Sequence, residues 1–332
     1  IMNKKESIGI VLGSALAPKK LIKLAKITEK SNFDEIWLAE DFFFTGGISG
    51  ASIVLANTKN ITVGLGIVSA VFRHPALLAM EISTISAVYP NRFYAGIGLG
   101  VPTWIRQVGL HPKSPLSAMR TCVTSVRKLL EGKTINETSE AFVFDNVCLE
   151  YPEIQTKTPL HMGVIGPKML KLSGEISDGT IFSVAASHEY VKWAQNLIVE
   201  GTNKSTLLLN KHRLTLYAIY SVDDDSSKAK NAVRVPLAFY KSIGTNTLTD
   251  VYGNSNELKK LIELGGYEAV RDNMPDKWIE DLTISGSPRE VSEKIKSYFD
   301  IGIDSVALFP MPSENADKMI SITTEKVLPF LD

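Results

Sequence analysis

The sequence predicts a single-domain (β/α)8 barrel, or TIM barrel, over residues 1–332, with loop insertions at its C-terminal face. Three observations lead to this fold class. Short β-branched runs alternate with helical patterns almost throughout, eight such runs can be assigned, and no Pro/Ser-rich linker divides the 332 residues. A barrel of this class needs about 250 residues, so the remaining length accommodates insertions.

The predicted strands are short aliphatic runs of the kind that is buried on both faces of a parallel sheet. They cover residues 7–13, 35–39, 61–68, 92–97, 160–164, 179–183, 214–222 and 304–309. Helices are predicted between them at residues 18–30, 50–57, 75–88, 117–131, 167–176, 188–200 and 288–299. Pro75 suits a first helical position, because the donor that proline lacks has no partner there. This alternation favours a closed barrel over an open doubly wound sheet.

The composition argues against several classes of function. Lys+Arg and Asp+Glu number 36 each, so the chain has no net charge with which to attract nucleic acid. No apolar run approaches the ~18 residues that span a bilayer, and no secretory signal is recognisable, so we expect a cytoplasmic protein without membrane contact. Cys122 and Cys148 have neither CxxC spacing nor a neighbouring His cluster, so no metal site is expected.

Two insertions interrupt the alternation, at about residues 134–158 and 242–281. The first alternates like a hairpin at Phe142, Phe144 and Leu149, and the second contains short helical pieces. We expect both near the mouth of the barrel. The loops that follow the strands build the active site in such barrels, so residues just after each predicted strand are the first candidates for chemistry.

Residues 61–100 contain the most informative pattern, which is strand, glycine-containing loop, helix and second strand. Gly66 in the first strand, and Gly98 and Gly100 after the second, allow another backbone or a flat ligand to approach closely. Parallel strands deliver their ends to the same side of a sheet. These glycines therefore predict a ligand site.

The segment GVIGPK, residues 163–168, is a second candidate site. It leaves a predicted strand and opens a helix at Pro167, so backbone N–H groups and the helix dipole point toward an anion. Lys168 would add a full positive charge, although a lysine in a first helical turn is as often only solvated.

With these strand ends marked, the chain resembles the bacterial-luciferase-like oxidoreductase family. Within it, the resemblance is to the branch that uses the deazaflavin coenzyme F420 and includes the methylenetetrahydromethanopterin reductases. The resemblance spans nearly the whole chain. Any one of its segments alone would be weak, because short glycine patterns recur by chance, but together they are specific. The segments are FDEIWLAEDFF (33–43), ITVGLGIVSAVFRHPALLAMEISTI (61–85), NRFYAGIGLG (91–100), HMGVIGPKMLKLSGEISDG (161–179) and SGSPREVSEKIKSYFDIGIDSVALFP (285–310).

The resemblance implies that coenzyme F420 lies across the strand ends. It also implies a non-prolyl cis peptide bond, here Gly66-Ile67, that bulges against the central ring of the coenzyme. Residues 163–168 would then hold the phosphate of its tail. The cofactor-binding residues implied in this way are Gly66, Ile67, Val68, Gly98, Gly100, Gly163, Gly166, Pro167 and Lys168.

Glu40 and Asp41 are the catalytic candidates. They follow the second predicted strand, where relatives commonly carry Asp-His facing the reactive edge of the ring. The chain thus lacks the imidazole that could exchange a proton near neutral pH, and it has two carboxylates instead. Adjacent acids at a strand end are also often solvated or cap a helix. We therefore assign Asp41 to ring contact more than to proton transfer.

Two further residues are substrate candidates. Trp104 could stack on a planar substrate, or it could anchor the helix that follows. Ser14 stands with Gly13 at the end of the first strand, where no acidic residue is found. Glucose-6-phosphate dehydrogenases of this family carry a glutamate at the position of Val101, so that sugar phosphate is not the expected substrate.

For three polar residues near these loops we favour a structural interpretation, and for a fourth two interpretations stay open. His74 lies at a helix start, where a cap is more common than a general base. Ser69 would satisfy nearby backbone, and Asp178 would make the turn into the sixth strand. Arg73 is balanced between binding the coenzyme tail and simple solvation.

We therefore predict an F420-dependent oxidoreductase that transfers a hydride between C5 of the deazaflavin and a small organic substrate. A methylene-tetrahydropterin-type carrier is one candidate. The alternatives are an FMN-dependent luciferase-like monooxygenase and a non-catalytic flavin-binding relative. An aldolase-like barrel is set aside, since it needs a strand-end lysine and Lys168 falls in a helical turn. The resemblance also implies a homodimer, for which residues 48–55 or 77–85 offer apolar surface.

Overall fold

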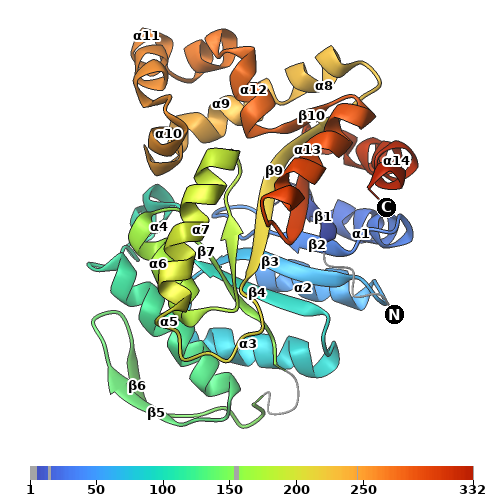
Figure 1. The fold of residues 1–332 in the computed structure, drawn as a ribbon. Helices are drawn as coiled ribbons and strands as arrows, with labels where there is room; N and C mark the ends of the chain where they lie inside the picture. Colours follow the sequence, from blue (N-terminus) through green and yellow to red (C-terminus); the bar gives the residue numbers. More distant parts are fainter. Residues whose placement is uncertain (1–5, 14–15, 153–156, 245, 332) are drawn as a thin grey trace.

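A computed structural model of the chain describes residues 6–13, 16–152, 157–244 and 246–331 (Figure 1). Eight parallel strands close into a barrel in the order β1-β2-β3-β4-β7-β8-β9-β11, with β11 returning to β1. The prediction of a (β/α)8 barrel is therefore confirmed, and all eight predicted strands are present. Their bounds are β1 Ser7–Leu12, β2 Glu35–Leu38, β3 Thr62–Ser69, β4 Phe93–Gly98, β7 Leu160–Gly163, β8 Gly179–Phe182, β9 Arg213–Val222 and β11 Ser305–Pro310.

The seven predicted helices also form, and five of the helices begin at a proline. Those around the barrel are α1 Leu21–Lys30, α2 Gly47–Ala56, α3 Pro75–Val88, α4 Pro102–Gln107, α5 Pro115–Leu130, α6 Pro167–Ile176, α7 His188–Thr202, α13 Pro288–Asp300 and α14 Ala316–Lys326. The helices α4, of six residues, and α14, of eleven, were not predicted. Short 3-10 turns span Pro18–Lys20, Ser313–Asn315 and Leu328–Phe330.

The second insertion forms a helical cover above the barrel (Figure 1), and it begins directly after β9, well before the predicted start at about residue 242. Its helices are α8 Ser226–Ala232, α9 Arg234–Ile243, α10 Asn246–Tyr252, α11 Ser255–Asn273 and α12 Asp276–Leu282. A short strand that the sequence did not predict, β10 Ile284–Gly286, returns the chain to the barrel and pairs with the end of β9. The insertion therefore leaves from and returns to the carboxyl end of one strand, which places it at the mouth as predicted.

The first insertion forms the predicted hairpin, with β5 Ile135–Thr138 and β6 Val143–Val147 in an antiparallel pair. It lies outside the barrel, against the helices rather than over the strand ends (Figure 1). Its turn reaches the rim of the mouth, because the Val143 carbonyl lies 3.1 Å from Nε2 of His74 at the start of α3. The hairpin was expected near the mouth, and this holds for its turn only. The hairpin follows the carboxyl end of α5, so it starts at the end of the barrel opposite the mouth.

The inside of the barrel is filled by aromatic side chains, and Trp37 is the largest of those that are fully buried. A Cβ atom at Gly64 would come within 2.6 Å of the Trp37 indole, and one at Gly9 within 3.0 Å. A larger side chain at either position would clash with the indole, which explains the two glycines. Below it, the Glu35 carboxylate accepts from Trp37 Nε1 at 2.8 Å and from the Ser305 hydroxyl at 2.6 Å. Together with the Arg213–Glu35 ion pair, these bonds close the amino end of the barrel.

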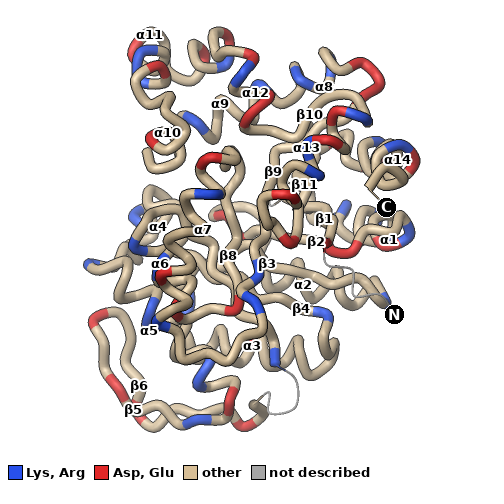
Figure 2. Tube along the Cα trace, in the orientation of Figure 1, with Lys and Arg blue, Asp and Glu red and all other residues tan. Residues whose placement is uncertain are grey.

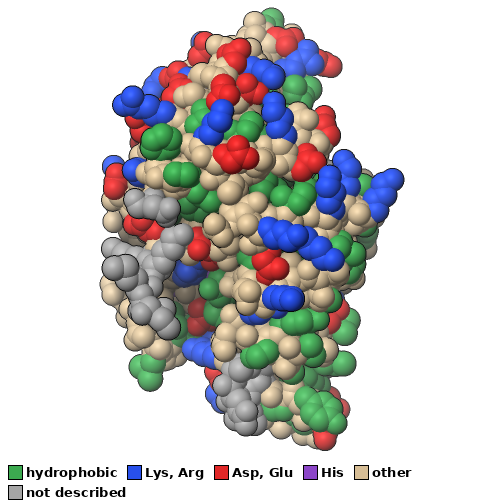
Figure 3. Space-filling view, turned by 90° about the vertical axis from the view of Figure 1, so that its right-hand side faces the viewer, with side chains coloured by type: hydrophobic (Ala, Val, Ile, Leu, Met, Phe, Trp, Pro, Cys, Tyr) green, Lys and Arg blue, Asp and Glu red, His purple; other side chains and the backbone are tan. Residues whose placement is uncertain are grey.

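Charges of both signs are distributed over the whole trace (Figure 2), in line with the equal counts of 36 basic and 36 acidic residues. The face shown in Figure 3 likewise has basic and acidic side chains interspersed. Within the described ranges, no helix is long and apolar enough to cross a membrane. Nor do the described residues contain a group of three or more His, Cys, Asp or Glu side chains arranged to hold a metal ion.

The packing around Trp37 predicts the effect of adding one methyl group. We expect Gly64→Ala to lower the free energy of unfolding by about 1–3 kcal/mol, because the new Cβ overlaps an indole that cannot move. Urea denaturation followed by tryptophan fluorescence measures this. Gly50→Ala is the matched control, since its Cβ would meet only ordinary contacts at 3.7 Å or more. Equal effects of the two substitutions would contradict the packing argument.

Candidate active site

The end of β3 forms an accessible apolar surface inside the mouth of the barrel. Gly66 and Ile67 are partly exposed, whereas Leu65 and Val68 on either side of them are buried. The pairing of β3 with β4 is interrupted between Leu65 and Val68, and the Gly66-Ile67 peptide bond is cis, as the resemblance implied. A flat ligand placed on these strand ends would therefore meet residues 66 and 67 first.

The side chain of Ile67 lies over two neighbouring strand ends. A Cβ at Gly98 would come within 2.9 Å of Ile67 Cγ1, and a Cβ at Gly163 would overlap Ile67 Cγ2. These two glycines thus make room for a protein side chain. Direct contact between them and a cofactor stays a prediction.

Glu40 joins three segments at the mouth. Its backbone N–H donates to the Ile67 carbonyl at 3.1 Å, and its carboxylate accepts from Gly47 N at 3.0 Å and from Arg73 Nη2 at 2.8 Å. The Glu40 side chain is only 8% exposed, and the Arg73 side chain 17%. Arg73 is therefore an ion-pair partner inside the loops and not a solvated residue.

The charges around Arg73 shift the pKa of two of these groups. Burial lowers the pKa of Arg73, but the hydrogen bond and charge of Glu40, with Glu81 beside it, outweigh burial and raise that pKa above its usual value. The pKa of Glu81 is also raised, because burial disfavours its charged form and Glu40 repels it, against the attraction of Arg73. The cluster is therefore a shared cation between two carboxylates.

Asp41 is the second catalytic candidate, and its side chain is partly exposed at the mouth. Its charge reaches two phenols, those of Tyr217 on β9 and Tyr240 on α9. Burial raises the pKa of both phenols, and the negative charge of Asp41 adds to the effect. The Tyr217 hydroxyl also packs against Gly66, where a Cβ would overlap it. Asp41 therefore belongs to the same site as the exposed end of β3.

The loop after β7 presents a helix start toward the mouth. Gly166 is the N-cap of α6 and offers no side-chain cap, Pro167 occupies the first turn, and Lys168 is exposed. A Cβ added at Gly166 would meet no atom within 4 Å, so the space beside it is open. Uncapped N–H groups next to open space suit an anion, and the binding of an anion here stays a prediction.

The remaining candidates have these positions. Gly100 has a φ of +94°, which explains glycine there. Trp104 is partly buried on α4, next to the buried Ile105. Val68 is buried, and Ser14 lies outside the described residues. The substrate roles of Trp104 and Ser14 thus stay predictions.

The structural interpretation of three polar residues agrees with their contacts. His74 caps α3, because its Nδ1 accepts from Ala76 N at 3.1 Å. The Ser69 hydroxyl donates to the Leu99 carbonyl at 2.6 Å. Asp178 accepts from Leu160 N and from Arg127 Nη2, both at 2.8 Å, at the amino end of the barrel.

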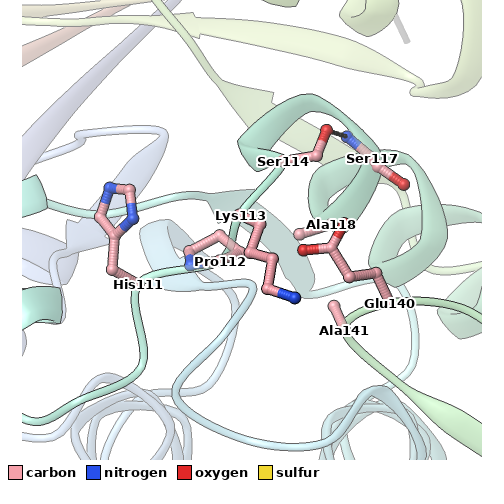
Figure 4. A pocket seen from close by; sticks show the side chains of 8 residues that line it. All are labelled: His111, Pro112, Lys113, Ser114, Ser117, Ala118, Glu140 and Ala141. Atoms are coloured by element: carbon pink, nitrogen blue, oxygen red, sulfur yellow. Dashed lines mark hydrogen bonds between the residues drawn. The ribbon is translucent and has the colours of Figure 1, made fainter.

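Figure 4 shows a surface hollow between the start of α5 and the turn of the hairpin. None of its lining residues belongs to the candidate site. Its lining residues are His111, Pro112, Lys113, Ser114, Ser117, Ala118, Glu140 and Ala141.

Sequence reasoning missed one pairing and two members of the site. The pairing of Glu40 with Arg73 joins residues 33 positions apart, and no local pattern announces it. Tyr217 faces inward from the middle of a strand, and a phenol within a β-branched run was the only signal it offered. Tyr240 lies in the helical insertion, where no motif marks it.

The residues present fit a flat ligand with an anionic tail. The exposed surface of residues 66 and 67 would meet the ring, and the open space at Gly166 would take the anion. The phenols of Tyr217 and Tyr240 flank Asp41 at the same face.

Comparison with known proteins agrees with this geometry. The chain is similar to the 5,10-methylenetetrahydromethanopterin reductase of Archaeoglobus fulgidus, with 28% identity over 92% of this chain and 94% of the relative. It is also similar, at 24% identity over 95% and 93% of the two chains, to the F420-dependent glucose-6-phosphate dehydrogenase of Nakamurella multipartita. The solved structure of the coenzyme F420 dependent tetrahydromethanopterin reductase from Methanopyrus kandleri superposes with a TM-score of 0.86 at 23% identity, over 99% and 100% of the chains.

The family match covers most of the chain. The profile of the luciferase-like monooxygenase family aligns with residues 6–305, which include all strands of the barrel up to the start of β11. The chain therefore belongs to the luciferase-like monooxygenase family and is an oxidoreductase of that family.

Proposed function

We propose that the protein is a coenzyme F420-dependent oxidoreductase that transfers a hydride between C5 of the deazaflavin and a small organic substrate. The observation that carries the proposal is the partly exposed Gly66-Ile67 surface, which packs against Tyr217 and shares the mouth with the open start of α6. The relatives support the choice of coenzyme, since they include F420-dependent enzymes of similar length.

The chemistry of hydride transfer belongs to the deazaflavin when it is bound. The chain would contribute position and exclusion of water. Gly66, Ile67 and Val68 would support one face of the ring, leaving the other face to the substrate. Gly163, Gly166, Pro167 and Lys168 would hold the tail, and Gly98 and Gly100 would line the neighbouring strand end.

The two acids would then have different tasks. Glu40 is bound to Arg73 and Gly47, so we assign it a positioning role that fixes the loop beside Ile67. Asp41 remains the carboxylate that could contact the ring edge or hold a proton at its own oxygens. Trp104 and Ser14 would stand on the substrate side.

For the substrate we propose a methylene-tetrahydropterin-type carrier, since three reductases acting on methylenetetrahydromethanopterin are among the relatives.

A homodimer is also proposed. Leu77 and Met80 on α3 are 45% and 54% exposed, and Ile53 on α2 is 39% exposed, so both helices offer apolar surface.

Cofactor preference is the first test. We expect the purified protein to bind coenzyme F420 with a micromolar or lower dissociation constant and FMN much more weakly, in the same buffer. Fluorescence titration measures both constants. Preference for FMN would favour the monooxygenase alternative, and binding of neither would contradict the proposed function.

The division of tasks between the two acids is the second test. Asp41→Asn should lower kcat/KM with methylenetetrahydromethanopterin by about a hundredfold or more, because it removes the carboxylate from the ring edge, and should lower the melting temperature less than Glu40→Gln does, because the side chain is partly exposed. Activity followed through the coenzyme fluorescence and thermal unfolding measure the two effects.

Glu40→Gln is the companion variant, and its effect should be mainly on stability. It leaves Arg73 with a weaker partner inside the loops, so we expect about 2–3 kcal/mol of destabilisation in urea denaturation. A large loss of activity in Glu40→Gln with unchanged stability would contradict the positioning role.

A further inference from the structure

A small cavity lies between the helical cover and the strand ends. Two sides come from the barrel, namely the loops after β7 and β8, and the other sides come from α9 and α10. The lining residues are Ile165, Ser183, Val184, Ala185, Tyr240, Lys241, Gly244, Leu248 and Thr249. Two of them connect it to the candidate site, because Ile165 directly precedes the N-cap of α6 and Tyr240 lies within reach of the Asp41 charge.

Lys241 is the only lining residue whose side chain carries a formal charge, and it is 7% exposed. Its Nζ donates to Asn254 Oδ1 at 3.1 Å and lies 5.2 Å and 5.9 Å from the ring centroids of Trp278 and Tyr252. Among the described residues, no carboxylate oxygen lies within ion-pairing distance of this nitrogen. Burial lowers its pKa to about 8, and no acidic neighbour opposes that shift.

Asn254 adds a second unsatisfied donor. It is 6% exposed, its Oδ1 is used by Lys241, and its Nδ2 has no hydrogen-bond partner among the described residues. An ammonium group has three N–H donors, of which one is used here. Buried lysines are normally paired with an acid, and buried amide groups are normally hydrogen-bonded. The two side chains together therefore lack an acceptor, and specifically a negatively charged one.

Lys294 shows what a compensated lysine looks like in the same protein. It is also partly buried and lies 5.6 Å from the Tyr298 ring centroid. Unlike Lys241, it has the charges of Asp281 and Glu189 within reach, which oppose the effect of burial on its pKa. The lack of a counter-charge is therefore particular to Lys241.

We propose that Lys241, which lines this cavity, forms an anion subsite that binds a carboxylate or phosphate group of a ligand at the mouth of the barrel. Asn254 is not part of the cavity lining and supports the subsite through its hydrogen bond with the Lys241 ammonium group. The inference rests on the proposed function for the identity of that ligand. The cavity measures ≈ 40 Å³. A single water needs about 10–15 Å³ by the same kind of measure, so a terminal group of a few heavy atoms fits and a ring does not.

Two ligands could supply the anion, which are the tail of the coenzyme and an acidic substrate. Both would reach the cavity from the same side, since Ile165 and Tyr240 line it next to the anion loop and to Asp41. The recognition chemistry is the same in the two cases, a charge-assisted hydrogen bond from an ammonium group and a neutral one from an amide.

Inorganic phosphate is the probe, used on the full-length protein with and without coenzyme F420. We expect phosphate to raise the melting temperature of the wild type with saturation. In Lys241→Met its dissociation constant should be at least about tenfold weaker. Lys294→Met is the matched control and should keep the wild-type response. Equal phosphate binding in wild type and Lys241→Met, or no saturable binding in the wild type, would overturn the proposal.

A second variant keeps the test informative if Lys241→Met does not fold. Asn254→Asp places a carboxylate beside Lys241, so it should raise the melting temperature and remove the part of the phosphate response that Lys241→Met also removes. An undiminished phosphate response in Asn254→Asp would overturn the subsite.

The source of the anion is read from the same experiment. Loss of the Lys241-dependent phosphate response when the wild type is loaded with F420 would assign the subsite to the coenzyme tail. Retention of that response in the F420-loaded protein would assign it to a substrate. If the wild type does not bind F420 but shows Lys241-dependent phosphate binding, the proposed function fails and the subsite stands.

Discussion

The candidate site depends on how closely Ile67 packs against its neighbours. Its side chain occupies space that exists only because residues 98 and 163 are glycines on two adjacent strands. Its carbonyl accepts from Glu40 N, which ties the bulge to the loop after β2. Four segments thus meet at one side chain, and their mutual positions set the shape of the surface that a ring would contact. The ion pair of Glu40 and Arg73 secures the same meeting point from outside.

Two buried cations near the mouth are treated in opposite ways. Arg73 forms ion pairs with Glu40 and Glu81, so its positive charge is balanced within the protein. Its guanidinium is therefore a fixed part of the loops. Lys241 has aromatic faces and one amide oxygen around it. A buried ammonium group without a counter-charge is costly, and binding of an anion beside it would lower that cost. Arg73 therefore stabilises the loops, whereas Lys241 is proposed to bind a ligand.

The barrel could be predicted from the sequence because its strands are buried on both faces and therefore read as continuous apolar runs with helices between them. The strand ends, and with them Glu40, Asp41 and residues 163–168, followed directly. What could not be predicted were contacts between distant residues. Trp37 explains Gly9 and Gly64, and Ile67 explains Gly98 and Gly163, although a glycine pattern alone suggests ligand contact equally well. Tyr240 and Lys241 lie in an insertion of short helices, where periodicity reports burial and not function.

The path of the helical insertion has a consequence for how such a protein can change. The chain leaves the barrel after β9 and returns through β10, whose Ile284 pairs with Tyr220 of β9. The two stems are therefore neighbours, and everything between them can be lengthened, shortened or exchanged while the strands stay in register. Because Lys241 and Tyr240 are carried on this segment, the proposed anion subsite resides in an exchangeable module, whereas the surface at Ile67 proposed for the ring is part of the barrel. Grafting the segment between related barrels is a direct route to new substrate ranges.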